Sequence, residues 1–278
     1  MNGDAYVYVG GTCTVGDSNL ITNNTLKFAM ESGSVFGVAN GKSSSTRIGS
    51  ADNSYVVING GNILNNVYAG ANYGATASTK TSGTYYAKVK ILDGTIGGSV
   101  YGGGNNNGTG GSGATVPSSI EMSGGTVAGS IYGGSKTNGT IAGSSTVIIT
   151  NGEINTDVYG GGEGNNTVVA KGVTVTIGGT IANKPEIDGS VYGGSAFGLV
   201  NQDTTTNVSV TVNNGVITGS VFGGGKGGLN PDDNQNYIPY VNGNITVTIN
   251  NGDITNVFGG HDQAGSFANT DRKSTRLN

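Results

Sequence analysis

The chain has little of what most enzymes and small secreted domains are built on. It holds one cysteine, Cys13, one histidine, His261, and no tryptophan in 278 residues. A lone cysteine forms no internal disulfide, which excludes a disulfide-stapled scaffold. His261 lies in a loop near the end of the chain, so we expect neither a catalytic triad nor a histidine-based metal site. We also expect no cofactor.

Charge and long apolar runs are scarce too. Charged residues make up 11% of the chain, and the formal net charge is −4. Lysine and arginine are scattered singly, which argues against nucleic acid as a partner. No apolar run is long enough to cross a bilayer as a helix, so we expect no membrane span. Met1–Asp4 has neither the basic start nor the apolar segment of a signal peptide.

Glycine is abundant, with 54 residues, and it is arranged in a repeat. Most copies end in an apolar residue, an aromatic residue and two glycines. The aromatic positions are Phe36, Tyr68, Tyr101, Tyr132, Tyr159, Tyr192, Phe222 and Phe258. The steps between them are 32, 33, 31, 27, 33, 30 and 36 residues. Self-similarity at such a period predicts a stack of like units, whereas the same composition without a period would indicate disorder.

Each unit also contains a strand signal followed by a corner, as in Val89–Gly94. Alternating apolar residues predict a strand with one buried face, and the glycine allows a sharp turn. One unit is too small for a core, but stacked units can pair their strands at about 4.8 Å. We therefore predict an all-β fold, a parallel β-solenoid (β-helix) of about eight coils with 27–36 residues each and a right-handed winding. A β-propeller is the alternative, although it needs four strands and usually about 40–50 residues per blade.

Two apolar columns should line the interior of this solenoid. The first consists of Ile91, Met122, Ile149, Val212 and Ile249. The second consists of Ile96, Val127, Ile154, Ile217 and Ile254. Members of a column should be buried at equivalent positions one coil apart.

The chain divides into three segments. Residues 1–34 carry irregular or partial coils, and residues 35–270 carry the solenoid repeats. Residues 271–278 break with the repeat and place three of the 13 basic residues in eight positions. This string matches the translation of a common sequencing adapter, so we interpret it as not native. The chain is then a fragment, of metagenomic origin, whose signal peptide and anchor are expected outside it.

Carboxylates are the only candidates for catalysis. Glu153 and Asp157 lie in one coil, and Glu186 and Asp188 lie in the next, where sister coils carry Thr, Ser or Asn. Two carboxylates about 5–10 Å apart can serve a glycosidase. Random polar variation at exposed corners explains them equally well, and no basic residue is placed to assist. We therefore assign no catalytic residue.

One loop, Gly161–Val168, resembles the calcium-binding nonapeptide of RTX β-rolls. Asn166 stands where the acidic ligand is needed, and the motif does not recur every nine residues. Without a carboxylate, Ca²⁺ loses its main electrostatic attraction, so a glycine-rich loop without metal is the preferred interpretation.

The aromatic column has two interpretations. Its rings either pack on one another as a structural ladder or form a surface strip for sugar rings. The candidate carbohydrate-contact residues are Tyr68, Tyr101, Tyr132, Tyr159, Tyr192, Phe222 and Phe258. Valine and the aromatic residue are adjacent, so only one of each pair can point inward. We expect the valine inside and the ring outside or at the corner, and we favour the structural ladder.

Threonine pairs such as Thr174–Thr176 and Thr246–Thr248 resemble ice-binding faces. Equivalent coils carry Lys88–Lys90 and Ser119–Glu121 in the same places. The sequence therefore predicts no flat threonine array on this rod.

The repeats from Val35 to Gly260 resemble the glycine-rich Val-Tyr-Gly-Gly regions of large bacterial surface proteins, and more broadly the adhesin-like and pectate-lyase-like β-helix group. The resemblance implies an extracellular or cell-surface segment, without enzymatic activity, that acts as an adhesin or stalk. A carbohydrate-binding or polysaccharide-degrading (lyase or glycosidase) β-helix is the alternative. Expected partners are host or bacterial surface glycans or proteins. Because uncapped strands invite pairing, we also expect end-to-end self-association of the isolated chain.

Overall fold

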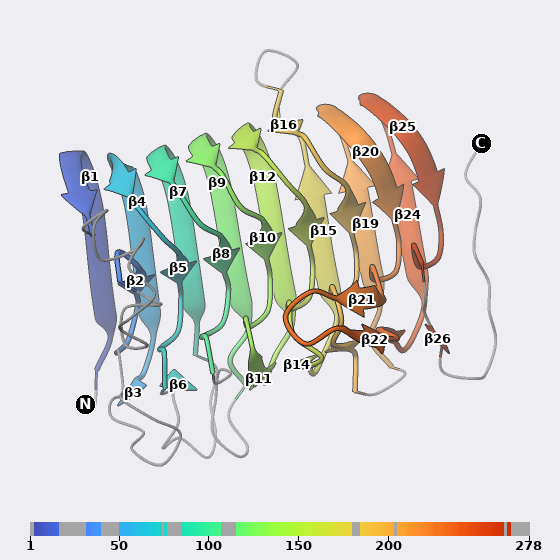
Figure 1. Ribbon diagram of the computed structural model, residues 1–278, viewed down its shortest axis with the longest axis horizontal. Helices are drawn as coiled ribbons and strands as arrows, with labels where there is room; N and C mark the ends of the chain where they lie inside the picture. Colours follow the sequence, from blue (N-terminus) through green and yellow to red (C-terminus); the bar gives the residue numbers. More distant parts are fainter. Residues whose placement is uncertain are drawn as a thin grey trace.

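The computed structural model describes residues 3–16, 32–39, 50–73, 75–76, 85–106, 115–179, 184–202, 205–263 and 266–267. These residues form strands, turns and bends, and the described part contains no helix. The strands stack along one axis into a rod (Figure 1). The expected adapter segment, residues 271–278, lies outside the described residues.

Long strands stacked in parallel form the main wall of the rod. They are β1 (Ala5–Val15), β4 (Ser54–Ile63), β7 (Ala87–Ile96), β9 (Ser118–Val127) and β12 (Ser145–Ile154). In the later coils the wall is split into β15 (Val173–Ile177) and β16 (Glu186–Ile187), β19 (Val208–Val212) and β20 (Val216–Phe222), and β24 (Ile245–Ile249) and β25 (Asp253–Phe258). A bend with positive φ interrupts each long strand, as at Gly94 (φ 103°) and Gly152 (φ 106°). These backbone angles explain why glycine recurs there.

Two further rows of short strands complete each coil. The aromatic row is β2 (Val35–Phe36), β5 (Val67–Tyr68), β8 (Val100–Tyr101), β10 (Ile131–Tyr132), β13 (Val158–Tyr159) and β17 (Val191–Tyr192), continued by the ends of β20 and β25. The return row is β11 (Asn138–Ile141), β14 (Asn166–Val169), β18 (Leu199–Val200), β23 (Tyr240–Val241) and β26 (Ser266–Phe267). A parallel pair, β3 (Ser50–Ala51) and β6 (Ala75–Thr76), lies nearer the N-terminus. The one antiparallel pair among the described strands is the hairpin of β21 (Gly228–Asn230) and β22 (Gln235–Tyr237).

These pairings confirm the parallel β-solenoid and exclude the propeller. Equivalent residues pair coil by coil, as Ile91 with Met122, Met122 with Ile149, and Val212 with Ile249. The members of both predicted apolar columns from Ile91 to Ile217 are buried in one continuous core. The exceptions are the last member of each column, both in the last described coil: Ile249 is 37% exposed and Ile254 is partly buried.

β1 extends the wall into residues 1–34, which were expected to hold irregular or partial coils. It pairs with β4 from Ala5 to Val15, with one shift of register after Gly11. Its inward Val9 is buried in the core, whereas its outward Tyr6 and Tyr8 are exposed. Regular strand structure therefore begins at Ala5.

Candidate functional site

The aromatic residues form one continuous stack along the rod. Eight rings, from Phe36 to Phe258, follow one another at centroid distances of 4.8–5.1 Å. Neighbouring rings are nearly parallel, with interplanar angles of 2–13°. The ladder favoured from the sequence is therefore present, and its geometry also shows that successive coils are rotated very little.

Burial of this stack rules it out as a surface for sugar rings. The valines lie in the central core, and the rings form a second cluster together with Ala196 and the partly buried Phe197. The rings thus lie outside the central core, as expected from alternation, but most of them are buried as well. The six predicted contact residues Tyr68, Tyr101, Tyr132, Tyr159, Tyr192 and Phe222 are at most 7% exposed. Only the seventh, Phe258, is open to solvent, because it lies in the last described coil.

Carboxylates accept hydrogen bonds from the buried hydroxyl groups of Tyr101, Tyr192 and Tyr159. Tyr101 donates to Glu163 Oε2 at 2.6 Å, and Tyr192 donates to Asp262 Oδ2 at 3.0 Å. Burial, reinforced by the nearby negative charge, raises the pKa of both tyrosines. They therefore stay protonated and act as donors. Glu163 and Asp262 each lie four residues after an aromatic residue of the stack, in the return loop of a later coil.

A ladder of polar side chains runs beside the aromatic stack, and sequence reasoning missed it. Each member lies two residues before an aromatic residue: Ser34, Asn66, Ser99, Ser130, Asp157, Ser190, Ser220 and Asn256. Except at the last step, the side-chain oxygen of one member accepts the backbone N–H of the next member, at 2.8–3.3 Å. At the last step, Asn256 donates from its side chain to Ser220 Oγ at 3.4 Å. The ladder satisfies backbone groups at the corner, which would otherwise be costly to bury.

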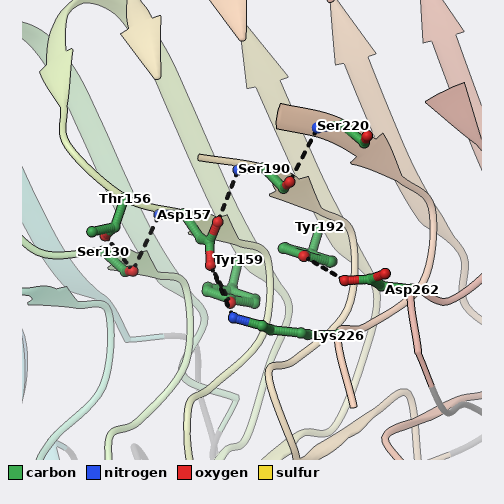
Figure 2. A network of polar contacts seen from close by, with 9 residues as sticks. All are labelled: Ser130, Thr156, Asp157, Tyr159, Ser190, Tyr192, Ser220, Lys226 and Asp262. Atoms are coloured by element: carbon green, nitrogen blue, oxygen red, sulfur yellow. Dashed lines mark hydrogen bonds and ion pairs between the residues drawn. The ribbon is translucent and has the colours of Figure 1, made fainter. Parts of the chain in front are cut away.

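Asp157 is the most heavily bonded member of this corner ladder (Figure 2). It accepts hydrogen bonds from the backbone N–H of Ser190 at 2.8 Å and from the hydroxyl of Tyr159 at 2.8 Å. Lys226, two coils further along, places its Nζ 3.3 Å from Asp157 Oδ2. Burial, neighbouring Tyr132 and the Asp157 charge raise the pKa of Tyr159. Asp157 thus joins three coils, and this structural role accounts for the carboxylate at this position.

The other three carboxylates considered for catalysis lie on the exposed outer surface. Glu153 and Glu186 are paired in register on adjacent coils, where β12 meets β16. Their α-carbons are therefore about 4.8 Å apart. Asp188 is also exposed, one position beyond Ile187. The structure brings Glu153 and Glu186 together but separates them from Asp157, which faces the aromatic stack.

The glycine-rich loop compared with RTX repeats is held by ordinary contacts. Thr167 donates to the carbonyl of Gly164 at 2.6 Å, Glu163 accepts from Tyr101, and Asn166 begins β14.

The single histidine also has a structural contact: His261 accepts the N–H of Gly225 through Nδ1 at 2.9 Å. Within the described ranges, no three His, Cys, Asp or Glu side chains gather as a metal site would need. The described part also lacks a helix of the length and hydropathy needed to cross a membrane.

Comparison with known proteins gives no relative. No family model matches the chain, and no curated protein or solved structure matches it significantly. Arguments about function therefore rest on the fold and on the side chains described above.

Proposed function

We propose that the chain is a non-enzymatic segment of a bacterial cell-surface or secreted protein that serves as a stalk or adhesin. The supporting observation is the unbroken inter-coil bonding: the aromatic stack and the corner ladder both run through eight coils. A rod built this way holds its ends at a fixed separation, which suits a spacer that projects from a cell. Its outer surface can then carry adhesive contacts.

The return loop between Phe222 and Ile245 is the best place for such contacts. Most large apolar side chains that are exposed lie in the first or last described coil. Away from those coils the exposed ones are Tyr86, Leu229, Ile238 and Tyr240. Three of these four belong to this loop, which also contains the hairpin of β21 and β22. Exposed apolar groups beside amide and carboxylate side chains are suited to glycans or proteins of a cell surface.

Binding of the full chain to arrayed host and bacterial surface glycans and glycoproteins tests the adhesin role. We expect binding to at least one class, weakened in Tyr240→Ala and retained in Tyr86→Ala, the matched control outside the loop. Equal binding by both variants would remove the loop from the proposal. Absence of binding throughout would leave only the stalk role, which predicts a rigid rod in small-angle scattering.

One observation favours the alternative, a polysaccharide-degrading β-helix. Glu153 and Glu186 are exposed neighbours, and retaining glycosidases hold two carboxyl groups about 5 Å apart. Incubating the chain with a panel of polysaccharides and measuring new reducing ends decides between the two. The proposal predicts no release of sugar, whereas release that is lost in Glu153→Gln or Glu186→Gln would overturn it.

We further propose that the isolated chain associates end to end. Val257 and Phe258 in β25 are 47% and 46% exposed, although their partners one coil earlier, Val221 and Phe222, are buried. An open strand with an exposed apolar edge invites another strand. Light scattering should show oligomers that grow with concentration, and a stable monomer at high concentration would contradict this.

A further inference from the structure

One outer face of the later coils carries an ordered array of hydroxyl groups. Strands β12, β15, β19 and β24 lie side by side in Figure 1, and register places their outward residues in two rows. The first row is Thr146, Thr174, Ser209 and Thr246, and the second is Ile148, Thr176, Thr211 and Thr248. We call these eight residues the threonine face. The expectation that no such array exists holds for the earlier coils and is wrong for these four.

The hydroxyl groups of the threonine face are free. None of them forms a hydrogen bond with another residue of the described ranges. The backbone groups beside them are used in the parallel ladder and do not compete for the side chains. The hydroxyls are therefore available to an external partner.

The strands of the threonine face are paired without any shift of register, and their coils are rotated little relative to one another. Rings of the same four coils, from Tyr159 through Tyr192 and Phe222 to Phe258, are 4.8, 5.0 and 4.9 Å apart and tilted by 6°, 5° and 13°. Ordinary sheets turn by about 20–25° from strand to strand. Along each strand the two rows are about 6.7 Å apart. Threonine has a restricted χ1 in strands, so methyl and hydroxyl groups recur in similar orientations.

Charge is absent from the threonine face and present on the same wall immediately before it. Glu121 pairs in register with Ile148, and its carboxylate binds Lys88 Nζ at 2.6 Å. From β12 onward both rows are neutral. The threonine face is thus an uncharged, regularly spaced array of hydroxyl and methyl groups. Such an array is suited to the surface of a crystalline, uncharged ligand.

We propose that the threonine face binds ice. Its two spacings, about 4.8 Å between coils and about 6.7 Å between rows, are close to the spacings of oxygen atoms on a prism surface of hexagonal ice. Its side chains are already ordered by the strands, so binding costs little further conformational entropy. A crystalline polysaccharide is the other neutral lattice, but aromatic platforms for sugar rings are missing from both rows. The inference is independent of the stalk or adhesin proposal.

Ice-crystal shaping and inhibition of ice recrystallisation by the full chain test this inference. We expect wild-type protein to facet growing crystals and to inhibit recrystallisation. The double variant Thr176→Lys, Thr211→Lys should lose both effects, because strongly hydrated ammonium groups interrupt the lattice at its centre. Thr95→Lys is the matched control, since Thr95 is an exposed threonine outside the two rows, and it should keep both effects.

Circular dichroism and melting curves establish that the variants are folded, as expected because Thr176 and Thr211 point outward and are partly exposed and Thr95 is exposed. Unshaped crystals with wild-type protein would overturn the inference whatever the variants do. Full activity in the folded double variant would overturn it as well. Adsorption to crystalline cellulose or chitin without any effect on ice would assign the face to polysaccharide and reject ice.

Discussion

Serine and threonine have opposite roles on two surfaces of the same coils. In the corner ladder, Ser130 and Ser190 accept backbone N–H groups of the next coil. On the threonine face, Ser209 and Thr211 bond to no described residue. The chemistry of the side chains is the same, so the local backbone makes the difference. At the corner the N–H groups need an acceptor, whereas on the wall neighbouring strands already supply one.

The largest expected effect separates the two faces of one strand. Ile149→Asp places a charge in the core, where Ile149 is fully buried, and should cost at least about 4 kcal/mol of unfolding free energy. The adjacent Ile148→Asp, on the outward face, should cost less than about 1 kcal/mol. Urea denaturation followed by circular dichroism gives both values. Similar losses at the two positions would contradict the assigned inward and outward faces.

Alkaline pH should lower the stability of the fold through the buried tyrosine hydroxyls of the aromatic stack, and not through the serine and threonine hydroxyls of the threonine face. Burial raises the pKa of Tyr101, Tyr132, Tyr159 and Tyr192 in the folded chain. An unfolded tyrosine has a pKa of about 10, so the stabilisation is present below that pH. Above it the unfolded state loses protons first, and stability falls by up to about 1.4 kcal/mol per pH unit for each tyrosine.

Tyrosinate absorbance and circular dichroism, recorded together during a base titration, check this linkage. Ionisation of the buried tyrosines should coincide with unfolding above about pH 10. Ionisation of all 13 tyrosines in a chain that stays folded would show that the stack is open to solvent.

A smaller effect is expected at the most heavily bonded position of the corner ladder. Asp157→Ala leaves the N–H of Ser190 and the hydroxyl of Tyr159 without their acceptor, at a cost of about 1–3 kcal/mol. Asp157→Asn should cost less, because Asn66 performs the same task for Ser99. Melting curves of the two variants measure the difference. Wild-type stability in the alanine variant would mean that these contacts contribute nothing.

The sequence was sufficient for the architecture because period and alternation determine it. Residues such as Ile149 and Ile154 recur at fixed offsets from the aromatic positions, and their burial followed from that spacing. The depth of the aromatic stack did not follow, because alternation tells which way Tyr159 points and not whether its ring is buried.

The sequence contains a pattern that indicates the corner ladder. Every aromatic residue of the stack is preceded, two positions earlier, by Ser, Asn or Asp. That pattern shows a shared constraint, but the acceptor role depends on which N–H groups the corner leaves without a backbone partner, and this is decided by the folded structure. From the sequence alone, Asp157 is therefore indistinguishable from random polar variation at a corner, whereas its contacts with Ser190 and Lys226 give it a structural role. The threonine pairs were recognised in the sequence, but an array was rejected because earlier coils carry Lys88–Lys90 and Ser119–Glu121 in the same places.

The comparison of the two surfaces is tested most directly by one pair of serine variants. Ser190→Ala removes the acceptor of the Ser220 N–H, and Ser209→Ala removes a free hydroxyl. The measurement is the unfolding free energy of both variants by urea denaturation under identical conditions. We predict a loss of about 1–2 kcal/mol for Ser190→Ala and a change within about 0.5 kcal/mol for Ser209→Ala. Equal losses, or a larger loss at Ser209, would contradict the division between bonded and free hydroxyls.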